Sequence, residues 1–247
     1  MRIIKLEETA STNTWVSANR ADLELPSLVY ALRQPAGRGQ RGNSWESEPG
    51  KNLCASAFFR PAGVAPQCQF AVSEAVALAV TDFLRHHGVE AKVKWPNDIY
   101  VGSRKICGIL IEHAVTPGEI LYTIAGIGIN LNQLRFLSDA PNPVSLAMIT
   151  GREYDVDDAA VLLSDMLERR ISAITSADGE PGDPEALHEE FMKTLWRGDA
   201  SRYPFADRLR GERIEASIAG VAPNGIITLD LGDERRSYAF KEIEFIL

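Results

Sequence analysis

The sequence predicts an α+β protein in which a mixed sheet flanked by helices is followed by a small all-β module. Short β-type runs dominate the centre of the chain, for example Leu53–Phe59 and Ile120–Ile129. Two longer segments, Pro66–His87 and Val156–Ala173, repeat apolar residues at helical spacing. The C-terminal part changes to short β-type runs joined by turns such as Asn224-Gly225.

We therefore expect two domains, one over residues 1–197 and one over residues 198–247. A module of about fifty residues is close to the lower limit for independent folding, so we expect it to dock on the larger domain.

The first half of the chain contains a predicted strand at Ile3–Leu6, and Ser11 is a candidate N-cap for a helix over residues 14–19. Glycine stops the helix of Pro66–His87 at Gly88. The predicted strands that follow the first one cover Leu28–Leu32, Leu53–Phe59, Ala91–Trp95, Asp98–Val101, Lys105–His113 and Ile120–Ile129.

The second half is predicted to begin with helices. Pro143 precedes a short helix over Val144–Ile149, and the helix of Val156–Ala173 is longer. The tract Ser176–Pro184 is rich in Gly, Pro and acids and is predicted to be a loop, before a last helix over Leu187–Leu195. The strands of the C-terminal module are predicted at Arg213–Ile218, Ile226–Leu229 and Arg236–Phe240.

Composition excludes some classes of function. The formal net charge of −8 and the pI near 5.1 argue against a general nucleic-acid-binding surface. The three cysteines are far apart and fit neither a disulfide framework nor a zinc site. The N-terminus has no long apolar segment, so we expect a cytoplasmic protein without membrane attachment.

The segment from Gln34 to Trp45 contains three glycines, Gly37, Gly39 and Gly42, together with Arg38 and Arg41. Glycines allow the backbone N–H groups to approach a ligand, and guanidinium groups pair well with phosphate or carboxylate oxygens. The segment therefore suits an anion clamp, although arginine and glycine are also common in ordinary surface turns.

Lys94-Trp95-Pro96-Asn97-Asp98 places polar groups where a strand ends. Pro96 cannot donate to a central ladder, so the strand should stop there and present Asn97 and Asp98 at the sheet edge. Lys105 opens the next strand and can reach the same cleft. An ordinary hairpin with a charged turn is the alternative interpretation.

The run Gly126-Ile127-Gly128-Ile129-Asn130 ends another predicted strand. Glycine weakens a strand unless something must approach the backbone closely, so the run indicates either a binding surface or a β-bulge. The chain has no Gly-x-x-x-x-Gly-Lys-Ser/Thr motif, which argues against a P-loop nucleotidase.

Taken together, these motifs resemble those of the biotin protein ligases. The resemblance covers nearly the whole chain, and it is carried by Ser11-Thr12-Asn13, Gly37-Arg38-Gly39-Gln40-Arg41-Gly42-Asn43-Ser44-Trp45, Lys94-Trp95-Pro96-Asn97-Asp98, Arg104-Lys105-x-x-Gly108-Ile109-Leu110-x-Glu112 and Gly128-Ile129-Asn130. It implies that ATP and biotin form biotinyl-5′-AMP, and that biotin then passes to a lysine of a biotin carboxyl carrier protein. It also implies a catalytic domain similar to class II aminoacyl-tRNA synthetases, an SH3-like C-terminal β-barrel, and in many members a homodimer.

The resemblance also assigns roles to residues. The implied catalytic residues are Lys105, Arg38 and Arg41, whose cations would stabilise charge as the carboxylate attacks the α-phosphorus. The implied biotin-binding residues are Ser11, Thr12, Asn13, Gln34, Arg38, Gly39, Gln40, Lys105, Gly108, Ile109, Gly126 and Gly128. The implied nucleotide-binding residues are Arg41, Asn43, Trp45, Lys94, Asn97, Asp98 and Asn130, with Asp98 as a ligand for Mg²⁺.

Two departures from the family pattern are relevant to function. Gln40 stands where more basic versions of the loop have arginine, which would leave fewer cations to hold the adenylate. No N-terminal winged helix-turn-helix precedes the catalytic motifs, so we expect a monofunctional ligase that does not bind DNA as a repressor. We also expect residues 37–50 to be mobile without ligand and to close over biotin.

Two other functions fit part of the pattern. A lipoate protein ligase shares the fold and the adenylation chemistry but has different motifs. A biotin-sensing module without catalysis would not need Lys105, Arg38 and Asp98 together.

Overall fold

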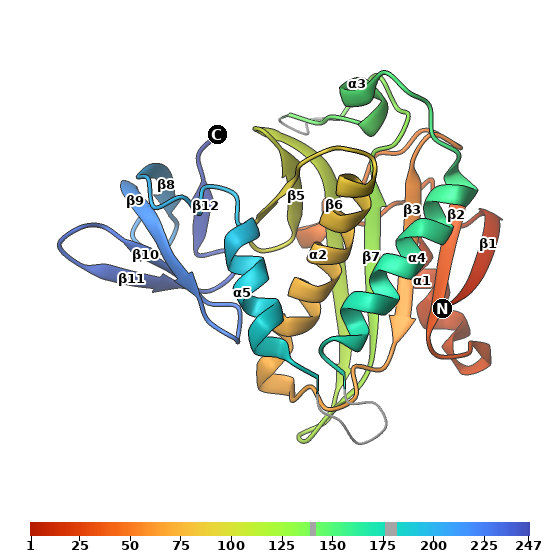
Figure 1. Ribbon diagram of the computed structural model, residues 1–247, viewed down its shortest axis with the longest axis horizontal. Helices are drawn as coiled ribbons and strands as arrows, with labels where there is room; N and C mark the ends of the chain where they lie inside the picture. Colours follow the sequence, from red (N-terminus) through yellow and green to blue (C-terminus); the bar gives the residue numbers. More distant parts are fainter. Residues whose placement is uncertain (139–141, 176–181) are drawn as a thin grey trace.

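The structure is a computed structural model that describes residues 1–138, 142–175 and 182–247, with the exception of the side chain of Arg41. Its strands form two sheets, and the larger sheet and its helices make up the main body (Figure 1). The described helices are all too short or too polar to span a lipid bilayer.

The larger sheet has seven strands in the order β1-β2-β3-β7-β6-β5-β4. Strands β1 and β2 are parallel, and the other neighbouring strands are antiparallel. The predicted mixed sheet is therefore confirmed. The strands are β1 (Arg2–Glu8), β2 (Ser27–Arg33), β3 (Leu53–Phe59), β4 (Lys92–Lys94), β5 (Asp98–Val101), β6 (Arg104–Val115) and β7 (Ile120–Ile129).

Helices cover one face of this sheet. They are α2 (Phe70–His86), α4 (Val156–Ser172) and α5 (Pro184–Thr194), which lie in front of the strands in Figure 1. Successive residues of a strand point to opposite faces. On β7, Ile127 and Ile129 belong to the core beneath these helices, whereas Gly126 and Gly128 point to the other face.

The opposite face is covered only in part. Helix α1 (Thr12–Asn19) packs Val16 against Val29, Phe58 and Ile124 near one edge of the sheet. The short helix α3 (Leu146–Thr150) follows the segment after β7. The strands between α1 and the C-terminal module are thus left without a covering helix on this face.

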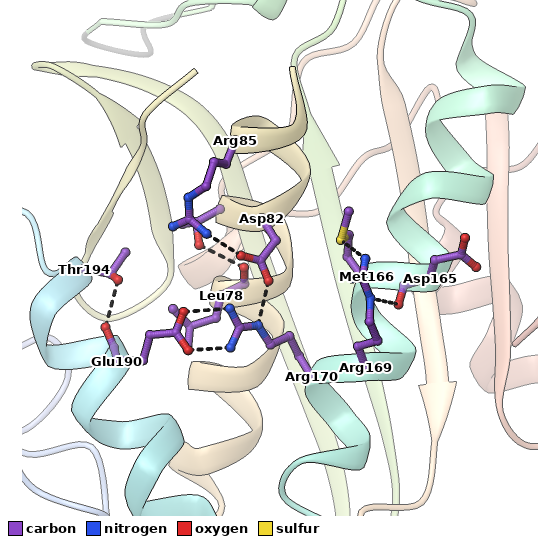
Figure 2. A network of polar contacts seen from close by, with 10 residues as sticks. Leu78, Asp82, Arg85, Asp165, Met166, Arg169, Arg170, Glu190 and Thr194 are labelled. Carbon is purple, nitrogen blue, oxygen red and sulfur yellow. Dashed lines mark hydrogen bonds and ion pairs between the residues drawn. The ribbon is translucent and has the colours of Figure 1, made fainter. Parts of the chain in front are cut away.

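A polar network ties the three covering helices together (Figure 2). Arg170 of α4 donates from Nε to Asp82 of α2 at 2.7 Å, and its two terminal nitrogens donate to the carboxylate of Glu190 on α5 at 2.5 and 2.7 Å. The hydrogen bonds to Glu190 raise the pKa of Arg170, against the opposing effect of burial. One guanidinium thereby joins α2, α4 and α5.

The C-terminal part forms a five-stranded antiparallel sheet in the order β11-β10-β9-β8-β12, with β11 and β12 at its edges. Its strands are β8 (Tyr203–Asp207), β9 (Glu212–Val221), β10 (Ile227–Asp230), β11 (Arg235–Tyr238) and β12 (Ile243–Phe245). This sheet docks on the larger one, as expected: the indole of Trp95 donates to the carbonyl of Gly225 at 3.0 Å, and Arg197 donates to that of Ile246 at 3.0 Å.

Some element predictions need correction. Strands β8 and β12 were not predicted. The predicted loop at Ser176–Pro184 lies outside the described residues for positions 176–181, and Pro184 is the first residue of α5, which the side chain of Asp183 caps. Ser11 occupies the N-cap position of α1, but its side chain makes no capping hydrogen bond.

His87 follows the last residue of α2 and makes edge contacts with the rings of Phe83 and Tyr154, at centroid distances of 4.9 and 4.8 Å. Burial lowers the pKa of His87, and the neighbouring His86 contributes in the same direction. The imidazole of His87 therefore binds a proton more readily in the unfolded chain than in the folded protein. Stability from the neutral ring is present above the ordinary pKa of 6.5 and decreases as the pH falls below it.

We expect His87→Phe to reduce the loss of unfolding free energy between pH 7.5 and pH 5.5. Urea unfolding at the two pH values measures it, and His86→Gln should have a smaller effect in the same direction, since burial is the larger cause of the lowered pKa of His87. An equal pH dependence in wild type and His87→Phe would contradict this prediction.

Candidate functional site

A cleft of about 760 Å³ lies on the sheet face opposite α2, α4 and α5. Every residue assigned to the site from the sequence lines it, apart from Arg41, whose side chain is outside the described part of the chain. The predicted residues that it brings together are Ser11, Thr12, Asn13, Gln34, Arg38, Gly39, Gln40, Asn43, Trp45, Lys94, Asn97, Asp98, Lys105, Gly108, Ile109, Gly126, Gly128 and Asn130.

Glycines form the floor of the cleft. A Cβ atom on Gly126 would lie 2.4 Å from Oδ1 of Asn13, and one on Gly128 would lie 2.4 Å from the ring of Trp45. The ladder on both sides of β7 is regular through these positions, so the alternative of a β-bulge is wrong. The glycines are needed because side chains from other elements lie directly on the sheet.

One wall comes from the start of α1 and is nearly buried. The side chain of Gln34 accepts hydrogen bonds from the backbone N–H and the hydroxyl of Thr12, at 2.9 and 3.2 Å. The hydroxyl of Ser56 on β3 lies 2.7 Å from Oγ1 of Thr12 and 2.6 Å from Oδ1 of Asn13. Thr12 and Asn13 are thus held in place from below by a serine of the sheet.

The glycine-rich segment folds back on itself. Trp45 donates its backbone N–H to Gly37 at 2.9 Å, Gly39 donates to Asn43 at 2.7 Å, and Gly42 has a φ of 83°. The guanidinium of Arg38 lies 2.9 Å from the carboxylate of Glu112 on β6. The segment is a turn that also forms a wall of the cleft, so a surface turn and an anion clamp are compatible interpretations of its sequence. Its closure over a ligand stays a prediction.

The Lys94–Asp98 segment is a hairpin, and its turn also faces the cleft, so both interpretations of its sequence apply. Strands β4 and β5 form an antiparallel pair in which Lys94 is opposite Asp98, and the turn between them lines the cleft. The side-chain amide of Asn97 donates to the carbonyl of Ile109 at 2.6 Å, which fixes this turn against β6.

The cations of the cleft differ in their surroundings. Lys105 forms an ion pair with Asp98 at 2.6 Å and lies 5.8 Å from the ring centroid of Trp45. Lys94 instead lies over the rings of Tyr100 and Phe245, at 5.1 and 5.5 Å. Burial lowers the pKa of Lys94, and the carboxylate of Asp98 opposes that shift.

Four buried side-chain polar atoms have no hydrogen-bond partner among the described residues, and three of them belong to residues that line the cleft. These three are Nε1 of Trp45, Oδ1 of Asn130 and Oδ1 of Asn142. Nearly all buried polar groups in proteins are paired, so unpaired donors and acceptors gathered in one cleft indicate a place for a polar ligand.

The fit of a metal can be judged from the oxygen atoms present. The described residues contain no group of three or more His, Cys, Asp or Glu side chains that could hold an ion. Magnesium bound to nucleotide phosphates needs only one or two protein oxygens. Asp98 and the unpaired Oδ1 of Asn130 both line the cleft and fit that requirement.

Sequence reasoning missed several residues of the site. Glu112 ends the motif that begins at Arg104, and the two-residue period of β6 places it on the same face as Gly108, but the family resemblance alone assigns it no role. Glu46 was also missed: it accepts backbone hydrogen bonds from Leu137 and Ser138 at 2.9 and 2.7 Å. Burial raises the pKa of Glu46, but these hydrogen bonds outweigh it and leave the pKa lowered.

The C-terminal module supplies another wall of the cleft, and no local pattern in the sequence indicates it. Ile243, Glu244 and Phe245 of β12 line the cleft together with residues of the larger sheet. A contact between segments this far apart in the chain depends on how the two sheets dock.

Comparison with known proteins identifies the family. The sequence profile of the Biotin/lipoate A/B protein ligase family matches residues 5–130. The bifunctional ligase/repressor BirA of Escherichia coli is 32% identical over 164 residues, which cover 66% of this chain and 50% of that protein. The chain thus spans about half the length of such relatives. The biotin–[acetyl-CoA-carboxylase] ligase of Paracoccus denitrificans is 31% identical over 66% of this chain and 70% of that protein.

The fold has a counterpart among solved structures. The biotin protein ligase from Aquifex aeolicus in complex with biotin and ATP matches with a TM-score of 0.78 at 19% identity, over 99% of this chain and 98% of that one. The family profile spans most of the motifs that meet in the cleft, and the chain belongs to the biotin/lipoate A/B protein ligase family.

Proposed function

We propose that this chain is an ATP-dependent biotin protein ligase. In the first step a carboxylate oxygen of biotin attacks the α-phosphorus of ATP, which gives biotinyl-5′-AMP and releases pyrophosphate. In the second step a lysine amine of the acceptor attacks the acyl carbon, which forms an amide and releases AMP. The observation that carries the proposal is one cleft that combines two paired cations, Lys105 and Arg38, with three unpaired buried polar atoms.

The residue roles of this proposal follow the family motifs. Biotin lies beside the start of α1, above the part of the glycine floor that Asn13 and Trp45 cover, with its carboxylate near Arg38 and Lys105. The nucleotide lies toward Trp45 and Lys94, with Mg²⁺ held by Asp98 and the oxygen of Asn130. Arg38 and Lys105 each already have a carboxylate partner in this structure, so ligand oxygens would replace or share those partners.

The acceptor that we propose is the biotin carboxyl carrier protein of acetyl-CoA carboxylase. The naming of the Paracoccus relative supports this choice. We further propose that the catalytic domain ends at residue 197, that the C-terminal sheet is an SH3-like β-domain, that the catalytic sheet is class II synthetase-like, and that the protein does not act as a repressor. A homodimer is compatible with this function.

Pyrophosphate release and transfer test the proposal. Wild-type protein mixed with ATP, Mg²⁺ and biotin should release pyrophosphate, and a biotin carboxyl carrier domain added next should gain one biotin at one lysine by mass spectrometry. The same assay with lipoate in place of biotin tests whether the protein is a lipoate ligase instead. Transfer of lipoate but not biotin, or no release of pyrophosphate, would overturn the proposal.

Gln40 provides a further prediction. With arginine at this position, one more cation would lie beside the phosphate, so Gln40→Arg should slow release of the adenylate from the enzyme by up to about fivefold. A quench and filtration assay with labelled ATP measures release, and Gln40→Met is the uncharged control of similar length. Unchanged release in Gln40→Arg would show that the loop does not use charge at this position.

A further inference from the structure

Glu112 stands at the rim of the cleft, where the glycine-rich segment meets the sheet. It lies on β6 two residues beyond Leu110, so the alternation of the strand places both on the cleft side. Its side chain is 39% exposed, and nothing in the proposed reaction uses it. Its two oxygens nevertheless contact two residues that line the cleft.

Each oxygen of this carboxylate has a separate partner. Oε1 accepts from Nη2 of Arg38 at 2.9 Å, and Oε2 accepts from Nδ2 of Asn13 at 2.8 Å. A glutamine would offer only one acceptor, and an alanine none. The bridge therefore depends on a side chain with two acceptor oxygens at this position.

The bridge fixes the orientation of Asn13. Its Nδ2 donates to Glu112 and, at 3.3 Å, to the carbonyl of Leu110, while its Oδ1 accepts from Ser56 at 2.6 Å. A flipped amide would lose these bonds on both sides. Asn13 also lies directly over Gly126, so it has little room to move.

The bridge also restricts Arg38. An arginine on a glycine-rich segment has many rotamers, and ordering a rotamer-rich side chain costs free energy when a ligand binds. Glu112 orders it before any ligand arrives. Because the guanidinium is planar and has five donors, it can keep one bond to Glu112 and still offer others to an anion in the cleft.

We propose that Glu112 is a positioning residue that orients Arg38 for the carboxylate of the ligand and locks Asn13 beside it. The inference rests on the proposed function, because it takes the ligand to be a biotin-like acid. Glu112 itself does not contact the ligand. It acts through Arg38, so its effect should depend on the negative charge of the ligand.

Binding of biotin and of its neutral amide, measured by calorimetry, tests this role. Glu112→Ala should weaken biotin binding by about tenfold, the order expected when the ligand must itself order a rotamer-rich side chain. Binding of the amide should change much less. Glu119→Ala is the matched control, since Glu119 pairs with Arg60 in an ion pair of similar exposure outside the cleft.

A double-mutant cycle shows whether Glu112 acts through Arg38. If it does, Glu112→Ala should add little to the effect of Arg38→Ala on biotin binding. Glu112→Gln keeps the size of the side chain, and it replaces Glu112→Ala in the cycle if the alanine variant does not fold.

Three results would overturn the inference. They are a change in biotin affinity no larger than that of Glu119→Ala, an equal loss for biotin and its amide, and independent effects of Glu112 and Arg38. If wild type bound neither biotin nor ATP, the proposed function would fail instead, and the pyrophosphate assay separates that failure from this one.

Discussion

Replacing Lys105 with alanine should slow pyrophosphate release by at least about a hundredfold, because a fixed cation at the developing charge of the transition state supplies an effect of that size. Lys105 is partly shielded from water, with 29% of its side chain exposed, and it lies between Asp98 and Trp45. Its position thus suits electrostatic stabilisation that needs little rearrangement. Single-turnover pyrophosphate release with saturating ATP and biotin measures the effect.

Stability separates this role from a structural one. The melting temperature of Lys105→Ala should stay close to that of wild type, since one partly exposed ion pair contributes little to folding. Lys193→Ala is the control, because Lys193 is 78% exposed and does not line the cleft. If Lys105→Ala did not fold, the role of the lysine would be structural. If its rate of pyrophosphate release were within a few-fold of the wild-type rate, Lys105 would have no role in the reaction.

Replacing Arg170 with alanine should lower the free energy of unfolding by about 2 kcal/mol, because Glu190 loses its guanidinium partner and Asp82 keeps only that of Arg85. Asp82 and Arg170 each have only 19% of the side chain exposed, whereas Glu190 is 41% exposed, so water compensates part of the loss. For a chain of this size, the melting temperature should fall by about 4–8 °C.

Arg169 is the matched control for Arg170, as Figure 2 shows. It is the preceding residue of the same helix, and among the described residues its side chain donates hydrogen bonds to Asp165 and Met166, both of α4. Arg169→Ala should therefore change stability by less than half as much. Similar effects of the two substitutions would mean that the network between the helices does not contribute to stability beyond helix propensity.

The sequence predicted most of the large sheet because its strands carry strong local signals. Leu53–Phe59 and Ile120–Ile129 were predicted with the bounds that the structure has. Strand β8 was missed since it is short and contains Pro204, and β12 has only three residues. The predicted start of α5 is wrong because Pro184 follows a tract rich in Gly, Pro and acids and resembles the end of a loop, although proline is favourable at the first position of a helix.

The candidate site was predictable to the extent that its residues lie in short motifs. The motifs named the residues that meet in the cleft, since their unusual glycines and polar groups at strand ends are visible in the chain itself. Which of these residues contact one another could not be predicted from the sequence. That Arg38 contacts Glu112, and that β12 closes one side, follows from the docking of segments more than seventy residues apart.

Two backbone segments that line the cleft should differ in how often their hydrogen bonds open: the floor strand β7 and the segment from Gly37 to Trp45. The floor strand β7 is hydrogen-bonded to β3 on one side and to β6 on the other, so its amide hydrogens should be among the slowest in the molecule to exchange with solvent. The segment from Gly37 to Trp45 closes on itself through a few bonds in the described part of the chain, and its amides should exchange quickly. A ligand held between them would slow exchange in that segment far more than in the floor, so exchange rates report occupancy without a chemical step.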